Sequence, residues 1–294
     1  MAENAKEREA TASGGGEESA APERKCAWRS DRLPKYQCKG PVSEVGQLCI
    51  LHSDDAEKNR EEFRAKLEEK KKAGDFDFRG TFFPEAVWFT GELKQANFSE
   101  VTFQGQADFS HATFLGQADF LQATFQGAAN FSRARFQGAA HFLEATFQGA
   151  AYFSVARFQG DANFRGARFQ GAAFFISSRF ETEARFRWTQ FRKEVSFVRS
   201  RFAGKAHLEQ IYLSGTVKFE EAEFGSAVFF RGPFYAAPTD EEEKEKGARA
   251  EARRQPIPPK LGFENVLLEE PGKARFEGLD LRKTTFAGTN VRQI

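Results

Sequence analysis

Residues 125–168 read FQGAANFSRAR, FQGAAHFLEAT, FQGAAYFSVAR and FQGDANFRGAR, which are successive copies of one 11-residue unit. Within each unit the two Phe residues stand six positions apart, and the next unit begins five positions after the second Phe. The same alternation runs from Phe98 to Phe202 and continues, with Leu at some positions, to Phe230. A short period sustained over so long a stretch predicts a solenoid, in which each repeat packs mainly on its neighbours.

An 11-residue period also suits a right-handed supercoil of amphipathic helices. Composition argues against helices, because a Gly stands two positions after the first Phe of most units and costs a helix interior about 1 kcal/mol each time. A small residue also stands two positions before nearly every Phe, as Ala129 does before Phe131. In an extended segment this spacing puts both side chains on one side of the chain. The repeats are therefore predicted to form short strands.

The units ADFSH, ADFLQ and ANFSR resemble the pentapeptide-repeat family, whose unit has a small residue, a polar residue, a central Leu or Phe and two polar positions. ATFQGA and ARFQGA match the same unit with one extra residue. The resemblance covers about residues 75 to 235, with a further short block near the C-terminus. It implies an all-β fold, a right-handed quadrilateral β-helix (β-solenoid) with four units and about 22 residues per coil, in which the central residue points inward.

Stacking by 22 residues predicts four interior columns, with neighbouring rungs about 4.8 Å apart. Aromatic rings at this spacing can stack with an offset, so the Phe residues of these columns are assigned to the core rather than to a ligand site. One predicted column contains Phe103, Phe125, Phe147, Phe169, Phe191 and Leu213, and the others begin at Phe109, Phe114 and Phe120.

Composition divides the chain into six segments. Residues 1–25 are rich in Ala, Glu, Gly, Ser and Lys and are expected to form a disordered tail. The charged, Pro-containing stretch 236–260 is expected to be a flexible insertion. The remaining segments are predicted to be a zinc-binding module at 26–53, a capping helix at 54–74, the pentapeptide-repeat solenoid at 75–235 and further pentapeptide-type coils at 261–294.

The short N-terminal helix is predicted from Asp54 at its start, Lys residues near its end and Gly74 just beyond it. Its one apolar pair is Phe63 and Leu67, which stand one helical turn apart. A solenoid leaves the core of its first coil uncovered and needs a cap. We therefore expect this pair to lie on the coil that opens at Phe76.

A candidate metal site is formed by Cys26, Cys38, Cys49 and His52, with the spacing Cys-x11-Cys-x10-Cys-x2-His. Three thiols and one imidazole make the ligand set of a tetrahedral structural zinc site, and the two ligands of the Cys-x2-His step can reach one ion from a single turn. The surrounding loop is poor in apolar residues, so zinc would supply its missing stability. The alternative is three ordinary reduced cysteines. The resemblance implies the same site, because comparable Cys and His segments precede the solenoid in some pentapeptide-repeat proteins. With four protein ligands, no catalytic role is expected of the zinc.

The sequence predicts no enzyme. It contains no GxSxG, P-loop, HExxH or GxGxxG motif. Outside the Cys and His cluster the remaining imidazoles are those of His111, His141 and His207. The register puts His141 and His207 in one outward column but three coils apart, about 14 Å, which is too far for a shared metal or a proton relay. Paired carboxylates are interpreted as solvated charges.

The charge is balanced overall, with 43 basic against 42 acidic residues and a net charge of +1, but it is uneven along the chain. Residues 133–205 hold 13 Arg and Lys against 5 Asp and Glu, and residues 206–251 hold 5 against 10. Such polarity could favour end-to-end contact between copies of the chain.

The candidate anion-binding column is Arg135, Arg157, Arg179 and Arg201, which stand 22 residues apart. Alternatively, Arg simply tolerates outward positions, with its stem lying over the neighbouring rung.

Three functions follow as hypotheses. The first is a non-enzymatic scaffold that presents a surface to a protein partner. The second is a nucleic-acid-binding module that uses the zinc knuckle and the Arg column, although a rung spacing near 4.8 Å does not match the phosphate spacing of about 3.4 Å and no exposed aromatic platform is expected. The third, implied by the resemblance, is a topoisomerase inhibitor that imitates duplex DNA, and a net charge of +1 argues against it.

We expect a cytoplasmic protein without a membrane segment. No run approaches the roughly 18 apolar residues of a membrane helix, and the N-terminus lacks the apolar core of a signal peptide. Bacterial proteins that resemble this one often continue into a membrane-anchored, channel-like region. We therefore expect this chain to be either a soluble variant or a truncated form.

Overall fold

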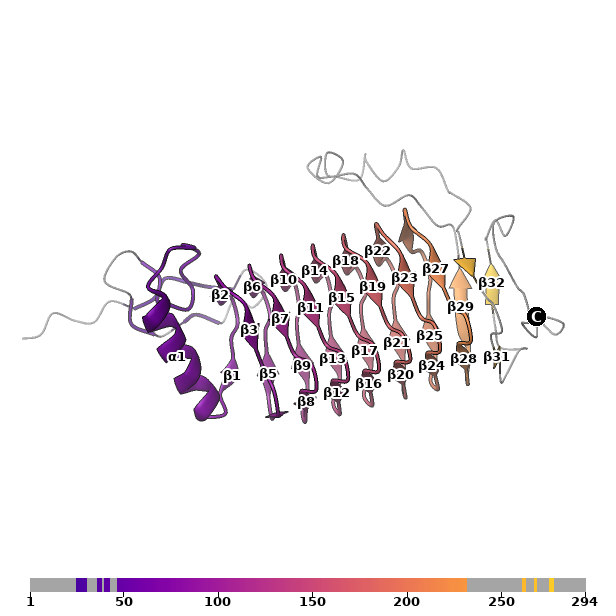
Figure 1. Cartoon of the computed structure of the whole chain (residues 1–294), viewed down its shortest axis with the longest axis horizontal. Helices are drawn as coiled ribbons and strands as arrows, with labels where there is room; N and C mark the ends of the chain where they lie inside the picture. The colour runs from indigo at the N-terminus through magenta and orange to yellow at the C-terminus, as the bar shows by residue number, and fades with distance from the viewer. Residues whose placement is uncertain are drawn as a thin grey trace, which may run out of the picture.

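The computed structural model describes residues 25–30, 36–38, 40–42 and 47–231, together with strand residues 261–262, 267–268 and 275–277. The expected N-terminal tail up to residue 24, the insertion at 236–260 and most of the C-terminal coils lie outside these residues. Figure 1 shows the coils stacked in one row, with helix α1 (Arg60–Lys72) at the N-terminal end.

The coils build four parallel sheets, which we number as faces 1 to 4 in the order in which the chain passes through them. Face 1 contains β1 (Phe76–Asp77), β5 (Ala96–Asn97), β9 (Ala118–Asp119), β13 (Ala140–His141), β17 (Ala162–Asn163), β21 (Ala184–Arg185), β25 (Ala206–His207), β29 (Val228–Arg231) and β32 (Arg275–Glu277). Face 2 contains β2 (Phe82–Phe83), β6 (Thr102–Phe103), β10 (Thr124–Phe125), β14 (Thr146–Phe147), β18 (Arg168–Phe169), β22 (Gln190–Phe191) and β26 (Tyr212–Leu213).

Faces 3 and 4 complete each coil. Face 3 contains β3 (Val87–Trp88), β7 (Ala107–Asp108), β11 (Ala129–Asn130), β15 (Ala151–Tyr152), β19 (Ala173–Phe174), β23 (Val195–Ser196), β27 (Val217–Lys218) and β30 (Leu261–Gly262). Face 4 contains β4 (Glu92–Leu93), β8 (Thr113–Phe114), β12 (Arg135–Phe136), β16 (Arg157–Phe158), β20 (Arg179–Phe180), β24 (Arg201–Phe202), β28 (Glu223–Phe224) and β31 (Leu267–Leu268). The predicted β-solenoid with four units per coil is confirmed.

The register confirms the predicted 22-residue step, since Phe125 pairs with Phe103 on one side and with Phe147 on the other. The first coil differs, because Phe83 pairs with Phe103 across 20 residues. The reason is in the sequence of this coil, where the spacings between successive inward residues are 5, 6, 4 and 5 and add up to 20; these residues are Phe78, Phe83, Phe89, Leu93 and Phe98. Beyond the solenoid, the pairing of Phe230 with Phe276 returns the chain to face 1.

The interior consists of the four predicted columns of side chains. Along the face 2 column the ring centroids of Phe103 and Phe125 lie 5.0 Å apart, and those of Phe125 and Phe147 lie 4.8 Å apart with nearly parallel planes. Rings of different columns meet edge to face, as Phe125 and Phe131 do at 5.9 Å and 80°. Both arrangements are favourable for aromatic quadrupoles. The residue two positions before each face 3 Phe is Ala or Val, such as Ala129, and is buried.

One type of corner recurs every 11 residues and places a non-Gly residue in the left-handed region, for example Arg133 with φ 59° and Val155 with φ 61°. This conformation is uncommon for residues other than Gly, Asn and Asp. From Glu100 to Arg199 the amide of each such residue donates to a carbonyl of the next coil, as that of Arg133 does to Ser154 at 2.9 Å. Bonding between coils therefore holds the strained corners.

The other type of corner contains, in most coils, the Gly that follows Phe-Gln, and here successive coils approach closely. A Cβ at Gly149 would lie 2.5 Å from the carbonyl oxygen of Gly127 on the preceding coil, which is closer than real Cβ contacts. Thr182 and Lys193 occupy such positions in two of the later coils, so those corners accommodate a side chain. Glycine at this corner lets successive coils approach each other closely.

The helix begins later than predicted, at Arg60 rather than near Asp54. Asn59 is its N-cap, and its side chain accepts a hydrogen bond from the amide of Glu62 at 3.1 Å. At the other end Gly74 adopts φ 65° and its amide bonds to the carbonyl of Lys71, which ends the helix in a Schellman motif. The sequence therefore predicted the end of the helix better than its start.

The helix packs on the first coil through the apolar pair that the sequence indicates. Phe63 and Leu67 are its buried residues. The ring of Phe63 meets that of Phe83 edge to face, with centroids 5.6 Å apart. Arg64 forms a bidentate ion pair with Glu85, at 2.5 Å for each bond. The helix thus covers the aromatic core where the first coil would otherwise expose it.

Candidate metal centre

The four predicted ligands converge beside the first coil. Cys26 and Cys38 lie on two short antiparallel segments, held in part by the bond from the amide of Cys26 to the carbonyl of Gly40 at 2.9 Å. Cys49 and His52 lie in one turn, closed by the bond from the amide of His52 to the carbonyl of Cys49 at 3.0 Å. The three sulfurs and an imidazole nitrogen all lie within 4.8 Å of one another.

The separations between ligand atoms fit a tetrahedral ion. The sulfurs of Cys38 and Cys49 are 3.9 Å apart, and Cys26 Sγ lies 3.6 Å from His52 Nδ1. Bond lengths of about 2.3 Å to sulfur and 2.0 to 2.1 Å to nitrogen place two sulfurs about 3.8 Å apart, and a sulfur about 3.6 Å from a nitrogen, around zinc. Cys49 Sγ and His52 Nδ1 are closer, at 3.0 Å, so an ion would widen this pair slightly. The donor set and its spacing are compatible with a structural metal site.

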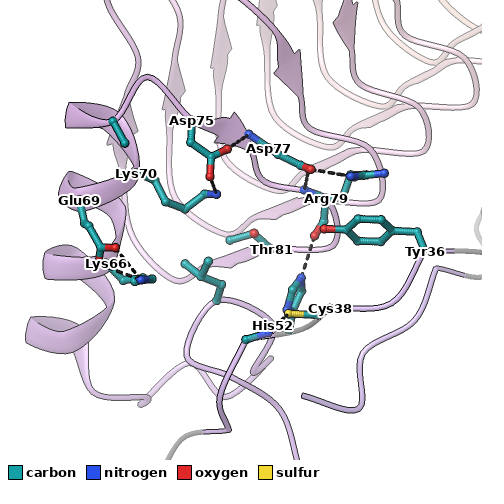
Figure 2. Close-up of a pocket in the computed structure, with 13 residues that line it drawn as sticks. Tyr36, Cys38, His52, Lys66, Glu69, Lys70, Asp75, Asp77, Arg79 and Thr81 are labelled. Carbon is teal, nitrogen blue, oxygen red and sulfur yellow. Dashed lines mark hydrogen bonds and ion pairs between the residues drawn. The ribbon is translucent and has the colours of Figure 1, made fainter. Parts of the chain in front are cut away.

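Surrounding groups hold the imidazole in a ligating orientation. His52 Nε2 donates a hydrogen bond to the backbone carbonyl of Arg79 at 2.8 Å (Figure 2). Because a carbonyl only accepts, this bond puts the ring proton on Nε2 and leaves the lone pair of Nδ1 facing the sulfurs. The ring of Trp28 stacks on the imidazole, with centroids 4.5 Å apart and planes at 6°. Metal-binding histidines usually have a hydrogen-bond partner of this kind.

Backbone amides donate hydrogen bonds to two of the three sulfurs. The amide of Cys49 donates to Cys26 Sγ at 3.2 Å, and the amide of Gly40 donates to Cys38 Sγ at 3.3 Å. The hydrogen bond from the Cys38 thiol, supported by His52, lowers the pKa of the Cys49 thiol to about 3. The same bond, together with burial, raises the pKa of Cys38, and burial raises that of Cys26. The cluster therefore holds one thiolate readily, whereas a bound cation would favour deprotonation of the other two thiols.

The module is joined to the solenoid by backbone and side-chain bonds. The amide of Phe82 donates to the carbonyl of Leu51 at 2.9 Å. The buried ammonium of Lys58 donates to the carbonyl of Ser53 at 3.0 Å and to that of Phe82 at 2.6 Å, and it lies 4.3 Å from the centre of the Phe63 ring. Burial lowers the pKa of Lys58 to about 8. Lys58 thereby connects the turn after His52, the helix and the first coil.

A cavity of about 300 Å³ lies between this module, α1 and the first coil (Figure 2). Tyr36, Cys38 and His52 line one side of it, and the ring of Tyr36 stacks on the Arg79 guanidinium at 3.4 Å. The charged groups of the wall form ion pairs with one another, so the cavity is interpreted as a seam between packed elements. These pairs are Lys66 with Glu69 at 2.8 Å, Lys70 with Asp75 at 2.5 Å and Arg79 with Asp77 at 2.5 Å.

Comparison with known proteins identifies the repeats. Residues 92–135 and 131–178 match a family model described as pentapeptide repeats (9 copies). The repeats at 92–178 are those of the pentapeptide-repeat family. No curated protein and no solved structure matches it. The match covers the central coils of the pentapeptide-repeat solenoid and does not extend to the Cys and His cluster.

The Arg column of the pentapeptide-repeat solenoid has the predicted register on face 4, where Arg157 pairs with Arg135 and Arg179. The side chains of these three residues are exposed, and in the part of the chain that the structure describes they form no ion pair. Arg201 differs, because its guanidinium forms an ion pair with Glu223 on the next coil. The candidate anion-binding column is therefore neutralised at its C-terminal end.

The solenoid histidines are separated as predicted. His141 and His207 share the outward column of face 1, with Asn163 and Arg185 between them. His207 Nε2 lies 2.8 Å from a carboxylate oxygen of Glu183. Among the described residues, the one group of three or more His, Cys, Asp or Glu whose ligand atoms converge is the Cys26 cluster.

Several aromatic side chains reach the surface, although the sequence predicts no exposed aromatic platform. Trp88 and Tyr152 on face 3 are exposed, and Trp188 at the corner of faces 1 and 2 lies 4.4 Å from the guanidinium carbons of both Arg165 and Arg187. The sequence does indicate that these aromatics are exposed, because each one occupies a position at which other repeats have a polar residue. In the part of the chain that the structure describes, no helix is long and apolar enough to span a bilayer.

Proposed function

We propose that this protein is a non-enzymatic interaction scaffold, in which a zinc-stabilised module and a helix close the N-terminal end of a rigid pentapeptide-repeat solenoid. The observation that carries the proposal is the convergence of three sulfurs and one imidazole beside the first coil. A solenoid with a closed end can present long side faces to partners without exposing its aromatic core.

Zinc would have a structural role at this site. Cys26, Cys38, Cys49 and the Nδ1 atom of His52 would hold it, and four protein ligands complete a tetrahedron without a position for water. The ion would join the antiparallel segments to the turn that contains Leu51, whose carbonyl accepts a bond from the first coil. Loss of the ion is therefore expected to release the cap and to leave most of the solenoid unchanged.

The module is tested by elemental analysis of the full chain, purified without chelators, and of Cys49→Ser and His52→Ala variants. We expect about one zinc per wild-type chain and a large loss in both variants, while His111→Ala, outside the cluster, keeps its metal. Hydrogen exchange after chelation should show lost protection at residues 47–58 and unchanged protection in the central coils. A wild-type chain that neither contains zinc nor takes it up would refute the zinc-stabilised module.

The scaffold role is tested by capture of partners from the native host, with chemical cross-links mapped onto the chain. A protein that cross-links to the faces of the solenoid and stays bound at about 200 mM salt supports the scaffold. Capture of nucleic acid that is lost at this salt concentration would favour the nucleic-acid alternative, and a hydrolytic or transfer activity of the purified chain would contradict a non-enzymatic role.

A further inference from the structure

The middle coils carry an apolar surface where the repeat normally has polar residues. On face 3 the outward side chains of successive coils are Asp108, Asn130, Tyr152, Phe174 and Ser196. Tyr152 is 38% exposed, and its ring stacks on that of Phe174 with centroids 5.4 Å apart. Two adjacent outward aromatics therefore replace the polar residues at this point of the solenoid.

The neighbouring corner extends this surface. Val155 is 46% exposed, and its amide donates to the carbonyl of Ile176 at 2.8 Å. The amide of Ser177 donates in the same way to Val198, which places Ile176 and Val198 on successive coils. We call the resulting surface the apolar corner; it consists of Tyr152, Val155, Phe174, Ile176 and Val198.

Val155 is an unfavourable residue at its position for two separate reasons. Its φ of 61° lies in the left-handed region, which is a genuine outlier for a β-branched residue. Its side chain is also exposed to water. The preceding and following residues of the same column, Arg133 and Ser177, have the same backbone conformation with polar side chains. Strain retained at an exposed apolar residue suggests a functional requirement for that side chain.

Cationic side chains border the apolar corner. Arg157 and Arg179 project from face 4, two to five residues after the apolar side chains of the same coils, and Arg133 and Arg135 lie on the preceding coil. Within the described residues these four guanidiniums take part in no ion pair, whereas Arg199 on a later coil is paired with Glu221 at 2.7 Å. The surface thus combines an exposed apolar centre with unpaired positive charge along one side.

We infer that the apolar corner and the Arg column bind an acidic amphipathic helix of a protein partner, lying along the solenoid axis. This inference rests on the proposed scaffold function and specifies its binding surface. The helix would place an apolar stripe on Val155, Ile176 and their neighbours, and a flanking row of carboxylates against Arg135, Arg157 and Arg179.

Dimensions favour a helix over an extended peptide. Rungs repeat at about 4.8 Å, and one turn of an α-helix rises about 5.4 Å, so the mismatch from Arg135 to Arg179 is about 1.2 Å in total. Side chains on one face of a strand repeat at about 6.8 Å, which gives a mismatch of about 4 Å over the same two rungs. Flexible Arg side chains can adjust to the smaller mismatch of a helix more easily than to the larger mismatch of an extended peptide.

The test uses a fluorescent, end-capped peptide designed as a helix of about six turns, with Leu on one stripe and Glu on the next. Fluorescence anisotropy with the full chain should show binding that weakens between about 50 mM and 500 mM salt. The double variant Arg157→Glu with Arg179→Glu should lower the affinity for the peptide at least about tenfold, because the peptide carboxylates would then face negative instead of positive side chains. The matched control, Arg165→Glu with Lys205→Glu, reverses two exposed charges elsewhere and should bind as the wild type does.

A second variant separates binding from folding. Val155→Asn suits the left-handed corner, so it should preserve or raise the unfolding temperature while lowering peptide affinity about tenfold. Three results would overturn the inference: unchanged affinity in the Arg157 and Arg179 variant, equal binding of a peptide with Lys in place of Glu, or no binding of the acidic peptide at low salt. If a cross-linked host partner remains bound to that double variant, the scaffold role stands and this surface is wrong.

Discussion

Replacement of Phe147 by Ala tests the interior columns directly. The Phe147 side chain is fully buried, and its ring stacks on Phe125 at 4.8 Å and on Phe169 at 4.6 Å. The coils cannot collapse into the space left behind, because the amide of Gln148 bonds to the carbonyl of Phe125 and the carbonyl of Phe147 accepts from Gln170, both at 2.8 Å. Truncation therefore removes the transfer free energy of a buried ring and leaves a cavity.

Phe-to-Ala changes in cores cost about 3 to 5 kcal/mol, and the loss of two stacked neighbours, at about 0.5 to 1.5 kcal/mol each, puts Phe147→Ala toward the upper end of this range. The matched control is Phe174→Ala on the outer side of face 3, where the cost should stay below about 1 kcal/mol. Urea unfolding monitored by circular dichroism gives both values, and hydrogen exchange shows whether the loss of protection centres on the coils beside Phe147. Equal costs for the two variants, or a cost below about 1 kcal/mol for Phe147→Ala, would refute the assignment of this column to the core.

Three further outcomes are expected. Gly149→Ala should destabilise the solenoid by about 1 to 3 kcal/mol in urea unfolding, because its Cβ would lie 2.5 Å from the Gly127 carbonyl oxygen, whereas Gln148→Ala on the outer surface should have little effect. Chelation should lower the stability of the cap alone, and a simultaneous loss of circular dichroism from the whole solenoid would contradict a local role for the metal. For Lys58 the folded pKa of about 8 lies below the ordinary value of 10.5, so the unfolded chain binds more protons between these pH values and stability should rise with pH across this window. The difference in stability between wild type and Lys58→Met isolates this effect from the thiols, and a difference that is constant from pH 8 to 10.5 would contradict the lowered pKa.

Much of the architecture is determined by the sequence alone. The alternation of five and six residues between Phe positions specifies inward and outward sides, and the 22-residue sum specifies which Phe lies above which, from Phe103 to Leu213. This works because a solenoid repeats one local conformation, so the contacts of each coil recur at a fixed separation along the chain. The cluster of three Cys and one His could also be identified, because Cys26, Cys38 and Cys49 are the only Cys residues of the chain and stand close to His52.

Other features depend on contacts that no local pattern encodes. The start of helix α1 was misplaced because Asp54 and Asn59 are both good N-caps, and the packing of Phe63 on Phe83 selects the later one. Trp28 stacks on His52 only because the antiparallel segments fold back over the turn.

The surface, too, was predictable from the sequence only in part. Register predicted the column of Arg135, Arg157, Arg179 and Arg201, but only the folded structure showed that Glu223 neutralises its last member. It also showed that Tyr152 and Val155 leave an apolar surface beside the unpaired arginines. Periodicity determines which side of a strand a residue occupies, whereas the partner it meets there depends on side chains brought together by the coils on either side.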